Sequence, residues 1–161
     1  MASEVISDRI EPRICNGKDD DIAARIPDPD TISSLSLAYI GDSVYELIMR
    51  TIALSKHNGS ANMINRFAKK YSNASTQAQM ISAIADDLTE REMHIYKRGR
   101  NAKSVSAPKN CTISQYRMAT GLEALFAHLY IEGKWDRAVE LAIAGIEKLS
   151  KDISEDIHAD V

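Results

Sequence analysis

Large apolar residues recur at helical spacing along this chain, and no segment shows the alternating pattern of a β-strand. The apolar stripes and the breaks between them predict six helices, over about 33–55, 61–72, 76–86, 89–97, 112–132 and 134–149. Ser60, Ser75, Thr89 and Thr112 are the expected helix starts, and Gly133 is an expected helix end. The sequence therefore predicts a single all-α domain over residues 31–150.

The two ends of the chain differ in character from this middle part. Residues 1–30 hold eight acidic and four basic side chains, three prolines and few large apolar residues, which predicts a disordered acidic leader. Residues 151–161 are expected to form a flexible tail. Residues 31–146 carry fourteen basic and ten acidic side chains, so the overall net charge of −3 does not exclude an anionic partner.

The sequence gives no sign of a membrane span, a signal peptide or a cysteine metal site. No apolar run approaches the roughly 18 residues that a membrane span needs, and the first residues lack the pattern of a signal peptide. Cys15 and Cys111 are too far apart in sequence to form a metal-binding spacing, and two cysteines suit a reducing compartment. We therefore expect a cytoplasmic protein with no membrane partner.

Two lone carboxylates on otherwise apolar helices, Asp42 and Glu123, are the main candidates for chemistry. Burying a carboxylate costs several kcal/mol unless it is paired or binds a metal. Each lies beside a glycine in the interior of a helix, Gly41 or Gly121, where glycine is unfavourable unless another backbone or a ligand comes close. The alternative is that both acids lie at the rim of a helical bundle and cap or pair locally.

The helical faces around these acids suggest a metal site. Ala38, Asp42 and Glu46 share one face, and Thr120 and Glu123 share a face with small residues that leave room for an ion and its waters. If the two faces meet, Asp42 and Glu123 can share a divalent cation. Ligands that are all oxygen, with retained water, are what Mg²⁺ prefers.

A basic segment over residues 97–109 contains five basic side chains and no acidic one. Such a segment can lie along the phosphates of a nucleic acid, although a charge run is often only a solvated loop. The residues predicted to contact RNA are Arg98, Arg100, Asn101, Lys103 and Lys109.

Taken together, these motifs resemble the catalytic domain of the ribonuclease III family, and in particular its short subgroup, the Mini-ribonucleases III. Residues 39–44, Tyr-Ile-Gly-Asp-Ser-Val, are similar to the family signature Phe-Leu-Gly-Asp-Ala-Val. Residues 122–125, Leu-Glu-Ala-Leu, resemble its second acidic helix. Residues 98–104, 108–110 and 116–117 resemble the short subgroup, and the resemblance covers about residues 33–145.

The resemblance implies a homodimeric endonuclease that hydrolyses double-stranded RNA with Mg²⁺, or with Mn²⁺ in its place. It implies 5′-phosphate and 3′-hydroxyl ends, and a role in maturing the ends of precursor 23S ribosomal RNA. A ribosomal protein that presents this substrate is a further expected partner. Asp42 and Glu123 would be the catalytic residues and the metal ligands.

Two positions depart from the wider family pattern. Ala38 and Thr120 stand where that family has a glutamate and an aspartate, and the family's separate RNA-binding module has no counterpart in the sequence. Glu46 and Thr120 are candidate auxiliary residues, and Glu46 has a surface role as its alternative. The alternative function is a non-catalytic scaffold of the same fold that binds RNA or the ribosome.

Overall fold

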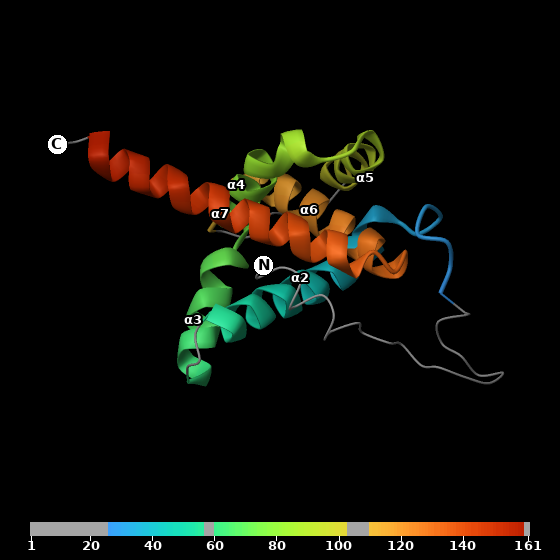
Figure 1. The fold of residues 1–161 in the computed structure, drawn as a ribbon. Coiled ribbons are helices and arrows are strands. Elements are labelled where there is room, and N and C mark those ends of the chain that lie inside the picture. Colours follow the sequence, from blue (N-terminus) through green and yellow to red (C-terminus); the bar gives the residue numbers. More distant parts are fainter. Residues whose placement is uncertain (1–25, 57–59, 103–109, 160–161) are drawn as a thin grey trace.

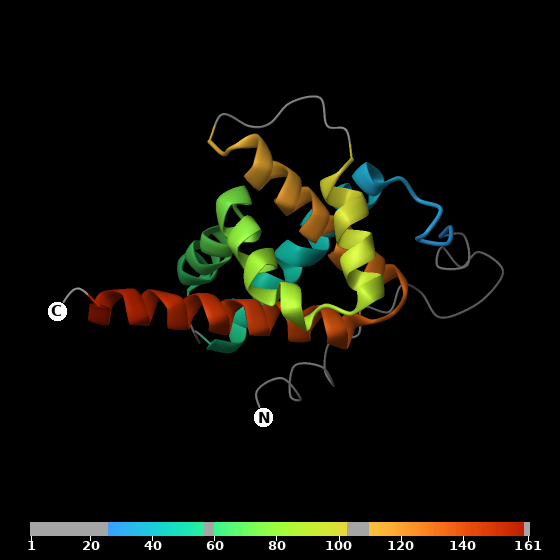
Figure 2. The same ribbon diagram turned by 90° about the horizontal axis from the view of Figure 1, so that it is seen from above.

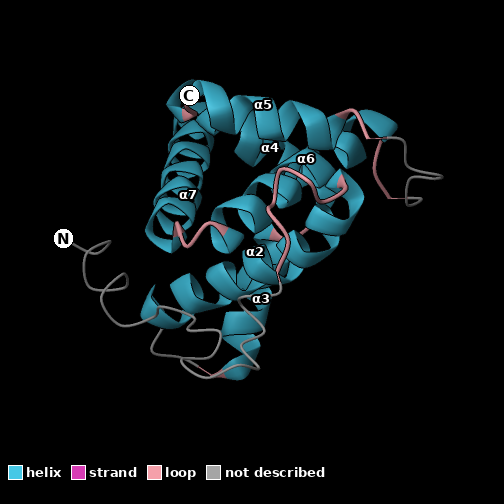
Figure 3. Cartoon of the chain, turned by 90° about the vertical axis from the view of Figure 1, so that its right-hand side faces the viewer, coloured by secondary structure: helices cyan, strands magenta, loops and turns pink. Residues whose placement is uncertain are grey.

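The computed structural model describes residues 26–56, 60–102 and 110–159, with side chains up to Lys151. These residues form helices and loops, and no strand occurs among them (Figure 3). The predicted all-α fold is therefore confirmed. Its elements are α2 (Ser34–Lys56), α3 (Ala61–Tyr71), α4 (Ala74–Ile84), the 3-10 helix η2 (Ala85–Asp87), α5 (Glu90–Arg100), α6 (Ile113–Ile131) and α7 (Trp135–Ala159).

Helix α6 is the central element, because it packs against α2, α4, α5 and α7. Figures 1 and 2 show α7 as the long helix along one side of the bundle, and α3 at the edge, beside the C-terminal end of α2. The rings of Tyr45 and Phe126 meet edge to face in the core, with centroids 5.2 Å apart. Burial of each such side chain contributes about 1.5–3 kcal/mol. Fully buried residues around this pair include Ile48, Ile81, Leu122 and Leu125.

Glycines allow α6 to approach two of its neighbours closely. A Cβ atom added to Gly41 of α2 would overlap the main-chain carbonyl group of Glu123 on α6. A Cβ atom added to Gly99 of α5 would lie 2.9 Å from the Cα atom of Gly121. These contacts involve main-chain atoms, which cannot rotate away as the end of a side chain can. The glycines at positions 41, 99 and 121 are therefore explained by the close packing of α6 against α2 and α5.

The helix ends follow the predicted signals in most places. Thr89 and Thr112 each form a complete capping box, and Gly133 adopts a φ of 72° after the end of α6. Ser60 occupies the N-cap of α3, but its side chain makes no capping hydrogen bond. The prediction that Ser75 starts α4 is wrong, because the N-cap is Asn73, whose side chain accepts from the Thr76 N–H.

Two helices are longer than the sequence pattern indicated. Helix α5 continues to Arg100, because Gly99 packs against α6 instead of breaking the helix. Helix α7 runs to Ala159, through most of the segment expected to be a flexible tail. Among the helices of the described ranges, none combines the length and the apolar character that a bilayer crossing requires.

A partly buried ion pair links α5 to α7. Glu92 accepts from Arg137 Nε at 2.9 Å and from the Thr89 main-chain N–H at 2.8 Å. Burial alone would raise the pKa of Glu92, but the hydrogen bonds from Arg137 and Thr89 outweigh it and lower that pKa. This carboxylate is therefore structural and fully compensated by its partners.

We predict that Gly41→Ala lowers the free energy of unfolding by at least about 2 kcal/mol, because α2 and α6 must separate to admit the new methyl group. Gly145→Ala is the matched control, since its Cβ would come close only to the flexible end of the Met80 side chain and would otherwise make an ordinary contact with Ile84 at 3.4 Å. The control is expected to stay within about 1 kcal/mol of the wild type. Urea denaturation measures both, and equal stabilities for the two variants would contradict the close helix crossing.

Candidate active site

Asp42 and Glu123 lie close together where α2 and α6 cross. The contact between Gly41 and the main chain of Glu123 fixes this crossing, and Asp42 is the next residue along α2. The Asp42 side chain is exposed, whereas the Glu123 side chain is partly buried. The structure thus brings together the two carboxylates that the sequence singled out.

In the described structure, no basic side chain compensates the negative charges of Asp42 and Glu123. Burial and, after it, the charge of Asp42 raise the pKa of Glu123 to about 7. Burial and then the charge of Glu46 raise the pKa of Asp42. No basic side chain in the described part of the chain contributes to either shift. The site therefore favours a bound cation or a bound proton.

The two carboxylates fit a divalent cation that keeps much of its own water. A cation between them would offset the mutual repulsion that the raised pKa of Glu123 reports. Within the described residues, no group of three or more His, Cys, Asp or Glu side chains is placed to hold a metal. Mg²⁺ suits such a sparse set, since it is often held by one or two carboxylates, waters and substrate phosphates.

The candidate auxiliary residues both make contacts within their own helices. Glu46 accepts from Arg50 at 2.6 Å in a surface ion pair one turn along α2, while its charge also acts on Asp42. The Thr120 hydroxyl donates to the Tyr116 carbonyl at 3.0 Å. Ala38, at the position where the wider family has a glutamate, is buried against Ala124 and Ala127. That position is therefore part of the packing between α2 and α6.

Gln77 is a polar residue at this site that the sequence analysis missed. It lies on α4 and is 2% exposed, and its side chain lies close enough to Glu123 to lower the pKa of that carboxyl group. The available signal was the same as for the two acids: a polar side chain among apolar neighbours, here Met80, Ile81 and Ile84.

The predicted RNA-binding residues are only partly described. Arg98 donates to the main-chain oxygens of Asp30 and Pro29, at 2.9 and 3.3 Å. The Arg100 guanidinium lies 5.7 Å from the centroid of the Tyr96 ring, and Asn101 is exposed at the C-cap of α5. Arg100 and Asn101 are thus next to each other on the surface, whereas Arg98 already has a structural role. Two further residues of this set lie outside the described residues, Lys103 and Lys109.

The segment that precedes α2 is held by charged contacts that were not predicted. Residues 26–30, which we assigned to the leader, are described, whereas residues 1–25 lie outside the described part. Asp30 accepts from Arg91 at 3.2 Å, and its other carboxylate oxygen lies 2.9 Å from Nε2 of the buried His128. The fully buried His128 therefore helps to hold this segment against α6.

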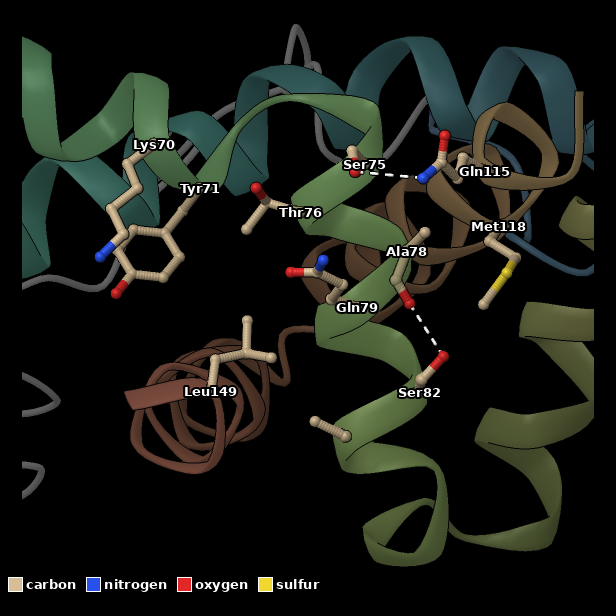
Figure 4. A pocket seen from close by; sticks show the side chains of 11 residues that line it. Lys70, Tyr71, Ser75, Thr76, Ala78, Gln79, Ser82, Gln115, Met118 and Leu149 are labelled. Atoms are coloured by element: carbon tan, nitrogen blue, oxygen red, sulfur yellow. Dashed lines mark hydrogen bonds between the residues drawn. The ribbon is translucent and has the colours of Figure 1, made fainter. Parts of the chain in front are cut away.

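A groove of about 700 Å³ lies elsewhere on the molecule, between the end of α3, α4, the start of α6 and α7 (Figure 4). Gln115 donates to the Ser75 hydroxyl at 3.1 Å within it, and the side chain of Gln79 lines it. Neither Asp42 nor Glu123 lines this groove. The carboxylate pair is therefore separate from this groove.

Comparison with known proteins agrees with this geometry. The family model of the ribonuclease III domain matches residues 35–134, which include both carboxylates and the helix crossing between them. A crystal structure of a protein from Fusobacterium nucleatum superposes with a TM-score of 0.64 at 30% identity, over 72% of this chain and 89% of that one. The fold and the site thus define a ribonuclease III catalytic domain, and this class supports an endoribonuclease.

Curated relatives narrow the assignment. Mini-ribonuclease 3 of Thermoanaerobacter sp. (strain X514) is 40% identical over 121 residues, covering 73% of this chain and 85% of the relative. Mini-ribonuclease 3 of Symbiobacterium thermophilum is 35% identical over 127 residues, covering 79% of this chain and 98% of the relative. The chain belongs to the Mini-ribonuclease III group of the ribonuclease III family.

We predict that Glu123→Gln stabilises the protein at pH 8 in the absence of divalent ions. The pKa of Glu123 is about 7 in the folded protein and 4.5 for a free glutamate side chain, so its contribution to stability falls as pH rises from 4.5 to 7. The gain at pH 8 should be up to about 3 kcal/mol, and it should vanish near pH 4. Urea denaturation with EDTA measures it, with the exposed Glu147→Gln as a control that should change little. A less stable Glu123→Gln protein at pH 8 would contradict the strained carboxylate pair.

Proposed function

We propose that the protein is a homodimeric endoribonuclease that hydrolyses double-stranded RNA with Mg²⁺ or Mn²⁺. The observation that carries the proposal is the pair Asp42 and Glu123, brought together without a basic partner in the described structure. A purely structural acid in this fold, Glu92, instead has an arginine partner. An uncompensated pair near the surface is consistent with a site that binds a cation together with its substrate.

Asp42 and Glu123 would hold the metal. When bound, the ion would polarise the phosphodiester, favour ionisation of a water and offset charge on the leaving oxygen. In the hydrolysis, a water oxygen bonds to phosphorus, the P–O3′ bond breaks and the 3′ oxygen takes up a proton. The products would be a 5′-phosphate and a 3′-hydroxyl end. The chain's own contribution is to fix both carboxylates on rigid helices through the packing of Gly41.

Contacts to the RNA backbone would come from the end of α5 and the segment that follows it. Arg100 and Asn101 are candidates in the described part, and Arg98 would join them in addition to its contacts with Asp30 and Pro29. Lys103 and Lys109, outside the described residues, complete the proposed set. Double-stranded RNA is recognised mainly by shape, phosphates and 2′-hydroxyl groups, so basic and amide side chains suit the task.

The outer face of α2 supports the homodimer. It carries an apolar stripe formed by Leu35, Tyr39, Ile40, Leu47 and Leu54, with Tyr39 84% and Leu47 48% exposed. Apolar side chains concentrated on one helix face usually mark an interaction site. Two copies of one helix can pair about a twofold axis, because such an interface is self-complementary. Asp42 lies on the same helix, so this pairing would bring two carboxylate sites near one duplex, one for each strand.

The substrate that we propose is the end of precursor 23S ribosomal RNA in the cytoplasm, presented by a ribosomal protein. Two observations support this substrate. The chain is similar to Mini-ribonuclease 3 proteins, and its residues 98–104 resemble the corresponding segment of that group. Comparing cleavage of this precursor with that of an unrelated duplex, with and without ribosomal proteins, tests it.

We predict that Asp42→Asn abolishes cleavage of a long, fully paired RNA in Mg²⁺ and leaves RNA binding within about threefold, since the change removes a metal ligand but little surface. Gel-based cleavage and filter binding measure the two effects. Asp86→Asn, at an exposed position in η2, is the control. Full activity in Asp42→Asn would remove this residue from the site. A wild type that binds RNA without cleaving it would instead favour a non-catalytic scaffold.

We predict that Arg100→Gln weakens RNA binding and reduces the slope of log K against log salt by about 1, the signature of one lost phosphate contact. Lys134→Gln is a matched control, because Lys134 is paired with Glu132 at 2.8 Å in the turn before α7. Binding titrations between 50 and 200 mM salt, a range in which such slopes are resolved, measure both. An unchanged slope in Arg100→Gln would place this residue outside the RNA interface.

We predict that Leu47→Lys converts the dimer to a monomer, because it buries a charge in the apolar stripe of α2. Ile113→Lys is the matched control, since Ile113 is 64% exposed but lies on α6. Sedimentation velocity measures the mass of each variant. A wild-type monomer, or a Leu47→Lys dimer, would contradict the proposed interface.

A further inference from the structure

Gln77 is a buried polar residue whose side-chain amide donor is not used in the described structure. It is 2% exposed on α4, and its Nε2 atom has no hydrogen-bond partner among the residues that the structure describes. Leaving such a donor unpaired in the interior destabilises the folded protein. An apolar side chain of the same length would avoid this cost, so the amide calls for a functional explanation.

The neighbour of this amide is the Glu123 carboxylate. Helix α4 packs against α6, and hydrogen bonding by Gln77 acts to lower the pKa of Glu123 against the larger effects of burial and of Asp42. Yet Nε2 does not complete a hydrogen bond of good geometry to any described residue. The donor is therefore within reach of the carboxylate and is not committed to another partner.

A neutral donor is suited to this position. A lysine or arginine would neutralise Glu123 and compete with a metal ion for it, as Arg137 neutralises Glu92. An amide can fix the orientation of a carboxylate while leaving its negative charge available. Ligating carboxylates are commonly hydrogen-bonded in this way, and loss of such a partner typically costs 10–100-fold in metal affinity or activity.

We propose that Gln77 is a positioning residue for Glu123, whose amide donates a hydrogen bond that orients the carboxylate toward a divalent cation. This inference rests on the proposed function, because it concerns the same site. In the metal-bound protein the donor gains its partner, so the cost of burying the unpaired amide falls mainly on the metal-free protein.

The test compares Gln77→Met with Gln79→Met. Methionine matches the length of glutamine and has no donor, and Gln79 is an exposed glutamine on the same helix that lines the separate groove (Figure 4). Calorimetric titration with Mn²⁺ alone, the Mg²⁺ concentration for half-maximal cleavage, and the melting temperature in EDTA are measured for each.

Gln77→Met is expected to weaken Mn²⁺ binding about tenfold or more and to raise the required Mg²⁺ concentration similarly. Its melting temperature in EDTA should equal or exceed that of the wild type, since an unpaired amide has been removed. Gln79→Met should match the wild type in metal binding and cleavage. Unchanged Mn²⁺ affinity in Gln77→Met, or weaker binding explained by a lowered melting temperature in EDTA, would overturn the positioning role.

A second variant distinguishes two roles of Gln77: a hydrogen-bond donor to Glu123 and a direct ligand of the metal. Gln77→Glu keeps the length of the side chain and replaces the donor with a carboxylate oxygen, so weakened Mn²⁺ binding in this variant supports the donor role. Retained or tighter binding would mean that the oxygen binds the metal, which overturns it. If the wild type itself shows no metal-dependent cleavage, the proposed function fails. If the wild type cleaves and Gln77→Met equals it, only the inference about Gln77 fails.

Discussion

The close crossing of α2 and α6 is the contact on which the rest of the site depends. It exists because Gly41 has no side chain, so that the main chain of α2 can meet the carbonyl group of Glu123. A methyl group there would move the two helices apart, and with them the two carboxylates. Gly99 and Gly121 repeat the arrangement between α5 and α6, which brings the basic end of α5 onto the same central helix.

The two ionised carboxylates destabilise the folded protein, and binding of a cation or a proton relieves this destabilisation. Burial and mutual repulsion raise the pKa of Glu123 to about 7, whereas Arg137 and Thr89 lower the pKa of the structural acid Glu92. The two cases show that this fold can compensate an acid when the acid serves stability alone. Sites that are strained in this way commonly reduce stability in exchange for function.

Much of this structure could be predicted from the sequence, because its signals are local. Helical periodicity, the capping boxes at Thr89 and Thr112, and the paired glycines and acids were all visible in short windows. Residues whose role depends on partners far away in the sequence could not be predicted. The unpaired amide of Gln77 and the contact of Arg98 with Pro29 depend on which helices meet, and no spacing along the chain encodes that. Helix α5 extends beyond its predicted end at residue 97 for the same reason, since the packing of Gly99 against α6 overrides the tendency of glycine to break a helix.

The most direct test of the account is to locate a metal ion in the protein. Crystals grown with Mn²⁺ would allow the ion to be identified by its anomalous scattering. We expect a peak between Asp42 and Glu123, with oxygen ligands at about 2.0–2.2 Å completed by water. A peak elsewhere, or none between these carboxylates at saturating Mn²⁺, would contradict the claim that the crossing of α2 and α6 builds a metal-dependent active site.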